Sequence, residues 1–150
     1  MKPSTHLILG FLISILLFLF DFSLFEISVF FLSSFFLIDL DHVPRFVLKE
    51  KSLNPIKFLR DHNSKKSKWT KLSLEQRKAY KKPVFFFHNI ETLLILLIIS
   101  IFLPIFFFVF FGFVFHLVCD LIYQHYHSYE KHYKLCLIYT LIKNNKKEFL

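Results

Sequence analysis

Two long apolar runs constrain this chain more than any other feature. They are "LILGFLISILLFLF" (7–20) and "LLILLIISIFLPIFFFVFFGFVF" (93–115). A helix that crosses a bilayer needs roughly 20 mostly apolar residues, and a run with no polar stripe has no face to turn toward water. Hydrophobic residues make up 55% of the 150 residues, and 23 of them are Phe. The sequence therefore predicts an integral membrane protein.

The apolar segments divide into four short spans, at about 6–21, 24–42, 85–102 and 105–123. Pro104 separates the last two, because a helix breaks or kinks at proline. Fusing 85–123 into a single helix would far overshoot a hydrocarbon core of about 30 Å. The segment "FDFSLFEIS" offers no small-residue cleavage site, so the first span is predicted to be an uncleaved helix rather than a signal peptide. We expect an all-α, four-helix membrane bundle that forms one domain over residues 1–150.

The charge distribution predicts the orientation of this bundle. Residues 43–82 hold 13 Lys or Arg and three acids, whereas the connection at 21–26 has no basic residue. Basic segments of membrane proteins stay in the cytoplasm. The positive loop at 43–82, the tail at 124–150 and both termini are therefore expected to be cytoplasmic, which agrees with an even number of spans.

The basic loop is expected to attract anionic lipid headgroups at the bilayer surface rather than nucleic acid. Within it, "SLEQ" (73–76) has the pattern of a capping box that starts a short helix, with Trp69 and Tyr80 as interfacial anchors. The stretch "QHYHSYEKHY" (124–133) favours an amphipathic interfacial helix. Its histidines His125, His127 and His132 leave a metal-binding role as an alternative.

Polar residues inside the predicted spans gather at the cytoplasmic side. Each span contributes histidine or carboxylate within about one or two turns of that side, whereas Asp21 and Glu26 mark the outer side. His116 and Asp120 are four residues apart, and the pairs Asp39–His42 and His88–Glu91 are three apart, so each pair is expected to share one helix face. Pro44 restricts Val43 and predicts the end of the second helix near 42.

These pairs predict a metal site. Pairs of His and carboxylate at such spacings build metal centres in helix bundles. Carboxylates at helix C-termini are disfavoured by the helix dipole, ionisable groups in a bilayer are costly, and carboxylates repel one another. A divalent cation relieves all three penalties. The predicted metal ligands are His6, Asp39, Asp41, His42, His88, His116 and Asp120.

The ordered motifs "THLILGFLIS", "FLIDLDH" and "FHLVCDLI" resemble the YdjM-like family of membrane-bound metal-dependent hydrolases, some of whose members are regulated by LexA. The resemblance covers most of residues 1–123. It implies about four spans and a site made by an N-terminal TH, a D-x-D-H after the second span and an H-x-x-x-D in the last. Where the family has an R-G-x-T-H-S block, this chain has "FFFHNIET", in which His88 takes the place of the histidine. The residues that the resemblance implicates are His6, Asp39, Asp41, His42, His116 and Asp120.

The functional hypothesis is a metal-dependent hydrolase at the cytoplasmic membrane interface. Mixed His and carboxylate ligands favour Zn²⁺, with Mn²⁺ or Fe²⁺ as alternatives. The metal lowers the pKa of water, and Glu91 or Asp41 is the candidate catalytic base. A site at headgroup depth favours an ester or phosphoester, such as that of a lipid, as substrate. The alternative is a non-catalytic metal-binding membrane protein, either a sensor or transporter-like, or a structural membrane protein. Substrate and oligomeric state stay open.

Overall fold

The computed structural model describes residues 3–73, 75–76, 85–126 and 136–138. Every secondary-structure element in these ranges is helical, which confirms the predicted all-α class. The elements are α1 (Pro3–Leu19), α2 (Leu24–Leu32), a π turn η1 (Ser33–Leu37), a 3₁₀ turn η2 (Ile38–Asp41), α3 (His42–Glu50), α4 (Pro55–Lys71), α6 (Ile90–Phe102) and α7 (Ile105–Tyr126).

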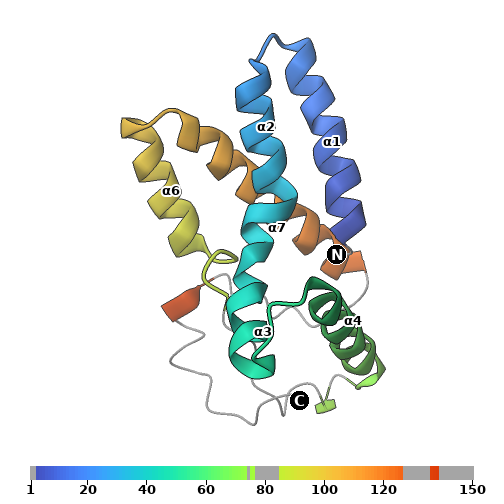
Figure 1. The fold of residues 1–150 in the computed structure, drawn as a ribbon. Helices are drawn as coiled ribbons and strands as arrows, with labels where there is room; N and C mark the ends of the chain where they lie inside the picture. The colour runs from blue at the N-terminus through green and yellow to red at the C-terminus, as the bar shows by residue number, and fades with distance from the viewer. Residues whose placement is uncertain (1–2, 74, 77–84, 127–135, 139–150) are drawn as a thin grey trace.

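The helices run up and down in two pairs (Figure 1). Helix α1 rises from the N-terminus and α2 returns beside it, whereas α6 rises and α7 descends behind α2. Helix α7 is central, because it packs against α1, α2, η1 and α6. The starts of α1 and α6 therefore lie toward the same end of the bundle as the ends of η2 and α7.

The helical segment that begins with α2 continues beyond the end predicted for the second span near residue 42. Helix α2, both turns and α3 follow one another without a break to Glu50, so the expectation that Pro44 ends this helix is wrong. The reason is positional. Pro44 is the third residue of α3, in a first turn where a backbone N–H has no intrahelical partner to lose.

The predicted basic loop is largely helical. Helix α4 begins at Pro55, and the Asn54 side chain caps it by accepting hydrogen bonds from Ile56 N at 2.9 Å and Lys57 N at 3.2 Å. Asn before Pro at a helix start is a recognisable local signal. The predicted capping box at 73–76 is confirmed by reciprocal bonds, Ser73 N to Gln76 Oε1 and Gln76 N to Ser73 Oγ. Tyr80 lies outside the described residues.

The third apolar helix begins later than predicted. Helix α6 starts at Ile90 rather than near 85, because Asn89 adopts an extended conformation and its side chain accepts the Thr92 N–H at 2.9 Å. His88 therefore precedes the helix, and the expectation that His88 and Glu91 share a helix face is wrong. The break at Pro104 is confirmed, since α6 ends at Phe102 and α7 begins at Ile105.

Small residues allow the helices to approach closely around the π turn. A Cβ on Gly10 of α1 would lie 2.6 Å from Ser34 Oγ, and one on Gly112 of α7 would lie 2.5 Å from Ser33 Cβ. Ser33 and Ser34 are fully buried. Both glycines of the chain thus lie where α1 and α7 contact η1. This kind of small-residue contact is typical of helix packing in membranes.

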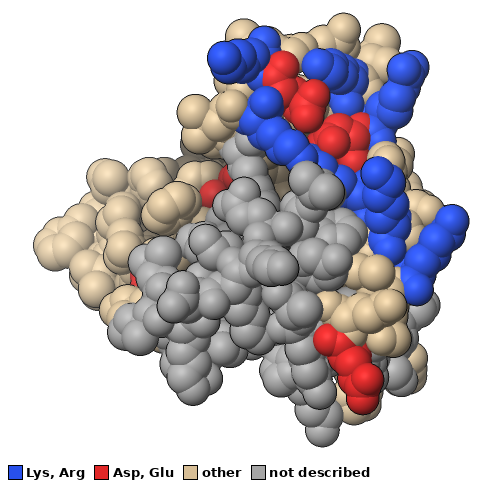
Figure 2. Space-filling model, turned by 90° about the horizontal axis from the view of Figure 1, so that it is seen from below, with Lys and Arg blue, Asp and Glu red and all other residues tan. Residues whose placement is uncertain are grey.

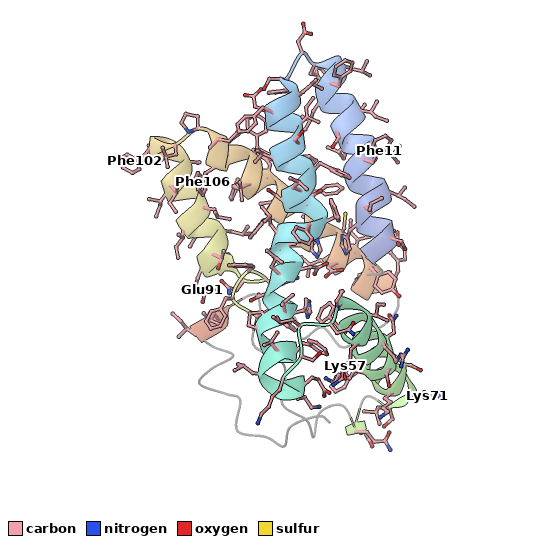
Figure 3. All side chains as sticks on the ribbon, viewed as in Figure 1. Phe11, Lys57, Lys71, Glu91, Phe102 and Phe106 are labelled. Atoms are coloured by element: carbon pink, nitrogen blue, oxygen red, sulfur yellow. The ribbon has the colours of Figure 1, made fainter. Side chains whose placement is uncertain are left out.

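The distribution of polarity is inverted relative to a water-soluble domain. Among the described residues, eight polar or charged side chains are buried, against seven hydrophobic ones. Large apolar side chains instead cover the outside of the helices, and Phe11 is 56% and Phe102 is 77% exposed. Figure 3 shows both on the apolar part of the bundle, with Lys57 and Lys71 at the other end. Within α7, Ile105–Tyr123 is long and apolar enough to cross a membrane, while the apolar parts of α1 and α6 are shorter.

Candidate metal centre

The structure brings the seven predicted metal ligands into one His–Asp cluster. They come from the start of α1, from η2 and the first residue of α3, from the bend before α6 and from the second half of α7. His6, His88, His116 and Asp120 are buried, whereas Asp39, Asp41 and His42 are partly buried. Their contacts divide them into an inner group (His6, His116 and Asp120) and an outer group (Asp39, His42 and His88), with Asp41 beside the outer one.

The inner group joins α1 to α7. His6 Nε2 lies 3.1 Å from Asp120 Oδ1, and His116 Nε2 lies 3.8 Å from Asp120 Oδ2. The imidazole rings of His6 and His116 stack with centroids 3.8 Å apart and planes 5° from parallel. The two rings therefore present nitrogens toward a single carboxylate.

The outer group is centred on Asp39. Its Oδ1 lies 3.6 Å from His42 Nε2 and 3.6 Å from His88 Nε2. The 3₁₀ turn supports the first contact, because side chains three residues apart eclipse in that geometry. The same Oδ1 lies 3.8 Å from His116 Nε2, so Asp39 also connects the outer group to the inner one.

A bond to the backbone orients His116, and Asp41 fixes the segment that carries His88. His116 Nδ1 lies 2.8 Å from the Ser34 carbonyl oxygen, which accepts a hydrogen bond when Nδ1 carries the proton and leaves Nε2 facing the carboxylates. Asp41 Oδ2 accepts the Phe87 N–H at 2.6 Å and lies 3.5 Å from His88 Nδ1. Asp41 thereby holds the segment that carries His88. Metal-ligating histidines commonly have a carbonyl partner on their second nitrogen, as His116 has here.

The Ser34 carbonyl and the Phe87 N–H are contributions that sequence reasoning missed. Both are backbone groups, so no residue type marks them. The signal that could have pointed to Ser34 is the presence of the only two glycines, Gly10 and Gly112, within the apolar runs. Such residues mark close helix contacts in membranes.

Glu91, one of the two candidate bases, binds a different part of the chain. Its carboxylate accepts hydrogen bonds from Leu137 N at 3.0 Å, Ile138 N at 3.3 Å and the Cys136 thiol at 3.1 Å. Figure 3 shows Glu91 at the start of α6, beside this C-terminal segment. Asp41, the other candidate base, lies next to His88. Of the two candidate bases, Asp41 is therefore the one that belongs to the cluster.

His125 lies in the last turn of α7, and His127 and His132 lie outside the described residues. The predicted interfacial helix at 124–133 is likewise described only as far as Tyr126, where α7 ends.

The end of the molecule below the cluster is basic. Seen from this end, Lys and Arg side chains gather over α3 and α4, interleaved with a few acids (Figure 2). Phe46 of α3 packs edge-on against Phe58 of α4, with ring centroids 5.2 Å apart, and Lys57 forms an ion pair with Glu50 at 3.3 Å. The two helices thus present one cationic surface. Its exposed bases are Lys49, Lys57, Arg60, Lys68 and Lys71.

Comparisons with protein-family models, with curated proteins and with solved structures found no match. The similarity to the YdjM-like family therefore rests on the sequence motifs alone.

Proposed function

We propose that this chain is a multi-pass membrane protein with a divalent metal centre at the cytoplasmic end of its helix bundle, and that the centre hydrolyses an ester or phosphoester bond at the membrane surface. The observation that carries the proposal is the meeting of three imidazole groups around the carboxylate of Asp39. They come from the start of α3, from the bend before α6 and from α7.

The spacing of the polar atoms supports a metal rather than a hydrogen-bond network. Hydrogen bonds between nitrogen and oxygen span about 2.7–3.2 Å. Of the six His–Asp contacts in the cluster only His6–Asp120 falls in that range, and the other five lie between 3.5 and 3.8 Å. Ligand atoms around a tetrahedral Zn²⁺ at about 2.0–2.2 Å from the ion are separated by about 3.4 Å. The observed separations are thus close to those of ligands that share an ion.

The types of ligand in the cluster indicate which ion to test first. Carboxylate and neutral imidazole fit Zn²⁺, with Mn²⁺ and Fe²⁺ as alternatives, so we propose Zn²⁺ as the first ion to test.

Placement in a membrane is supported by the inverted polarity of the bundle. An exposed apolar surface of this extent is unfavourable in water, and a bilayer removes that penalty. The basic surface of α3 and α4 (Figure 2) lies at the end of the bundle where α1 begins and α7 ends (Figure 1), which suits attraction to anionic headgroups of the cytoplasmic leaflet. In this orientation the cluster lies near headgroup depth, where the ester and phosphoester bonds of lipids are located.

The chemistry follows from the residues around the centre. A divalent ion, when bound, supplies Lewis acidity that activates water near neutral pH. Asp39 and His42, whose side chains are 31% and 25% exposed, form the accessible edge through which substrate and water enter. Asp41 holds the segment carrying His88 through the Phe87 N–H, and is the nearest candidate to accept a proton.

The first test is metal content, measured by mass spectrometry on the full chain purified in detergent. We expect stoichiometric metal in the wild type and its loss in Asp39→Ala and His116→Ala. Asp21→Asn is the matched control, because Asp21 lies in the turn at the opposite end of the bundle with φ 63°, a conformation that Asn also tolerates. Absence of metal from folded wild-type protein would rule out the hydrolase.

Activity is then assayed as the release of headgroup or fatty acid from phospholipid in mixed micelles, with the metal-loaded protein. Turnover that disappears in Asp39→Ala supports hydrolysis. Stoichiometric metal without turnover on either bond would favour a non-catalytic metal-binding protein instead.

A further inference from the structure

We infer that the metal centre holds one ion at Asp39, and that His6 and Asp120 do not bind it, although both are residue types that ligate metals. They act as positioning residues that fix the imidazole of His116. The inference rests on the proposed function and divides the residues of its metal centre into ligands and supports.

The contact between His6 and Asp120 is an ordinary hydrogen bond. His6 Nε2 lies 3.1 Å from Asp120 Oδ1, within the range of about 2.7–3.2 Å for such bonds. An ionised carboxylate only accepts hydrogen bonds, so His6 Nε2 carries the proton and donates it. A nitrogen that carries a proton has no lone pair left for a metal ion. The nitrogen that His6 directs at Asp120 is therefore not a ligand.

The stack of His6 on His116 leads to the same assignment. The two rings are 5° from parallel, with centroids 3.8 Å apart. The lone pair of an imidazole nitrogen lies in the plane of the ring. Two rings stacked face to face therefore direct their lone pairs along separate, parallel planes that do not meet at one ion. Only one ring of this pair can serve the ion at Asp39.

His116 is the ring of the pair that faces Asp39. Its Nε2 lies 3.8 Å from Asp39 Oδ1, and its Nδ1 lies 2.8 Å from the Ser34 carbonyl oxygen. Because a carbonyl oxygen accepts, Nδ1 carries the proton and the lone pair of Nε2 is left for the ion. His42 Nε2 and His88 Nε2 each lie 3.6 Å from the same carboxylate oxygen. The ion at Asp39 thus takes nitrogen ligands from three separate parts of the chain.

His6 and Asp120 instead restrict how the His116 ring can turn. The ring of His6 covers one face of His116, and the two side chains are only 2% and 1% exposed. Asp120 holds His6 in turn, and lies four residues after His116 on α7. With His6 on its face and the Ser34 carbonyl at its edge, the His116 ring keeps one orientation. Loss of a partner that orients a metal-binding histidine typically weakens metal binding about 10–100-fold.

The test compares two double variants of the full chain that differ only in the side chain at position 6. One combines His6→Ala with Asp120→Asn and removes the ring. The other combines His6→Phe with Asp120→Asn and supplies another flat ring that can stack. Both carry Asp120→Asn, so that neither has a carboxylate that has lost the hydrogen bond from His6. Zinc content and affinity are measured in detergent by competition with a chromogenic chelator.

We expect one equivalent of zinc in the wild type, in Asp120→Asn and in both double variants, because none of these changes removes a ligand. Asp120→Asn keeps an oxygen that accepts from His6 and should bind zinc as tightly as the wild type. The His6→Ala double variant should bind zinc about 10–100-fold more weakly. The His6→Phe double variant should recover most of this loss, because it restores the stack. Asp21→Asn, at the opposite end of the bundle, is the control and should match the wild type.

The visible absorption spectrum of Co²⁺ bound in place of zinc is the second measurement, because it depends on the number and type of ligands and on their geometry. We expect the wild-type spectrum in Asp120→Asn and in the His6→Phe double variant. His88→Ala, which removes a ligand, should alter it.

The outcomes separate this inference from the proposed function. Loss of zinc or an altered cobalt spectrum in Asp120→Asn would make Asp120 a ligand and overturn the inference, while a metal centre would stay in place. Equal zinc affinities of the two double variants would refute positioning by the stack. No zinc in folded wild-type protein would reject the proposed function itself. If the His6→Ala double variant fails to fold, zinc content and the cobalt spectra of Asp120→Asn and the His6→Phe double variant decide the question.

Discussion

Replacing Gly112 with alanine tests how closely α7 packs against the π turn η1. A Cβ at this position would lie 2.5 Å from Ser33 Cβ, 2.9 Å from the Phe30 carbonyl oxygen and 3.0 Å from Ser34 N, whereas ordinary contact begins at 3.4 Å. Relief therefore requires a shift of about 0.9 Å, from 2.5 to 3.4 Å. Two of the three atoms are backbone, so a change of rotamer cannot provide it.

The expected cost is about 1–3 kcal/mol of folding free energy, the usual penalty for overpacking. A glycine in a helix interior without such contacts would instead gain about 0.5–1 kcal/mol on becoming alanine. The sign of the change therefore tests the close approach. The shift should also weaken metal binding, because His116 lies one turn after Gly112 and its 2.8 Å bond to the Ser34 carbonyl would stretch beyond hydrogen-bond range.

The assay uses the buried thiol of Cys119, which is 8% exposed, in a Cys136→Ser background. Its labelling by a maleimide during denaturation in detergent reports the opening of α7. We expect Gly112→Ala to be labelled at lower denaturant and to lose zinc. Val118→Ala is the control, because this side chain is 45% exposed and its truncation should be nearly neutral. A Gly112→Ala protein as stable as the wild type, with full metal content, would refute the reasoning.

Three further predictions concern the surroundings of the cluster. Gly10→Ala should destabilise the fold less than Gly112→Ala, because the added Cβ would contact Ser34 Oγ, a side-chain atom that can move. Adding Ser34→Ala to Gly10→Ala should then restore stability. A double variant no more stable than Gly10→Ala would contradict this contact. Asn89→Ala should lower the free energy of unfolding by about 1 kcal/mol through loss of the cap on α6. It should also reduce zinc retention, because His88 directly precedes Asn89. Unchanged zinc retention would argue against a role for this cap in positioning His88. Removing zinc by chelation should lower the midpoint of thermal denaturation, because an ion present at a free concentration of 100 times its dissociation constant stabilises a fold by about 2.7 kcal/mol. An unchanged midpoint would show that the folded protein does not bind the ion.

Orientation is tested separately with reporters fused to the C-terminus. A cytoplasmic C-terminus predicts a fluorescent green fluorescent protein fusion and an inactive alkaline phosphatase fusion. The reverse pair of results would place the basic surface of α3 and α4 outside the cytoplasm and remove the argument for a site at the inner leaflet.

The sequence by itself determined the helical class and the polar residues that gather at one end. Both follow from local physics. Apolar runs of this length form helices whose backbone groups bond internally, Pro104 has to interrupt one of them, and ionisable residues such as His116 and Asp120 are too costly in an apolar segment to occur at random. Asn54 before Pro55 is an equally local signal for the start of α4, a helix that lies within the stretch 43–82, whose charge alone predicts only a basic loop.

Only the tertiary structure decided which of these polar residues meet. His6 and Asp120 are 114 residues apart, and no spacing rule relates them. The contacts of Asp39 with His88 and His116 depend on the π and 3₁₀ turns, which change the direction in which successive side chains point. His88 reaches the cluster because Asn89 starts α6 after it. Helix phase and the close approach at Gly112 are set by packing between distant segments, so a periodic pattern in the sequence cannot supply them.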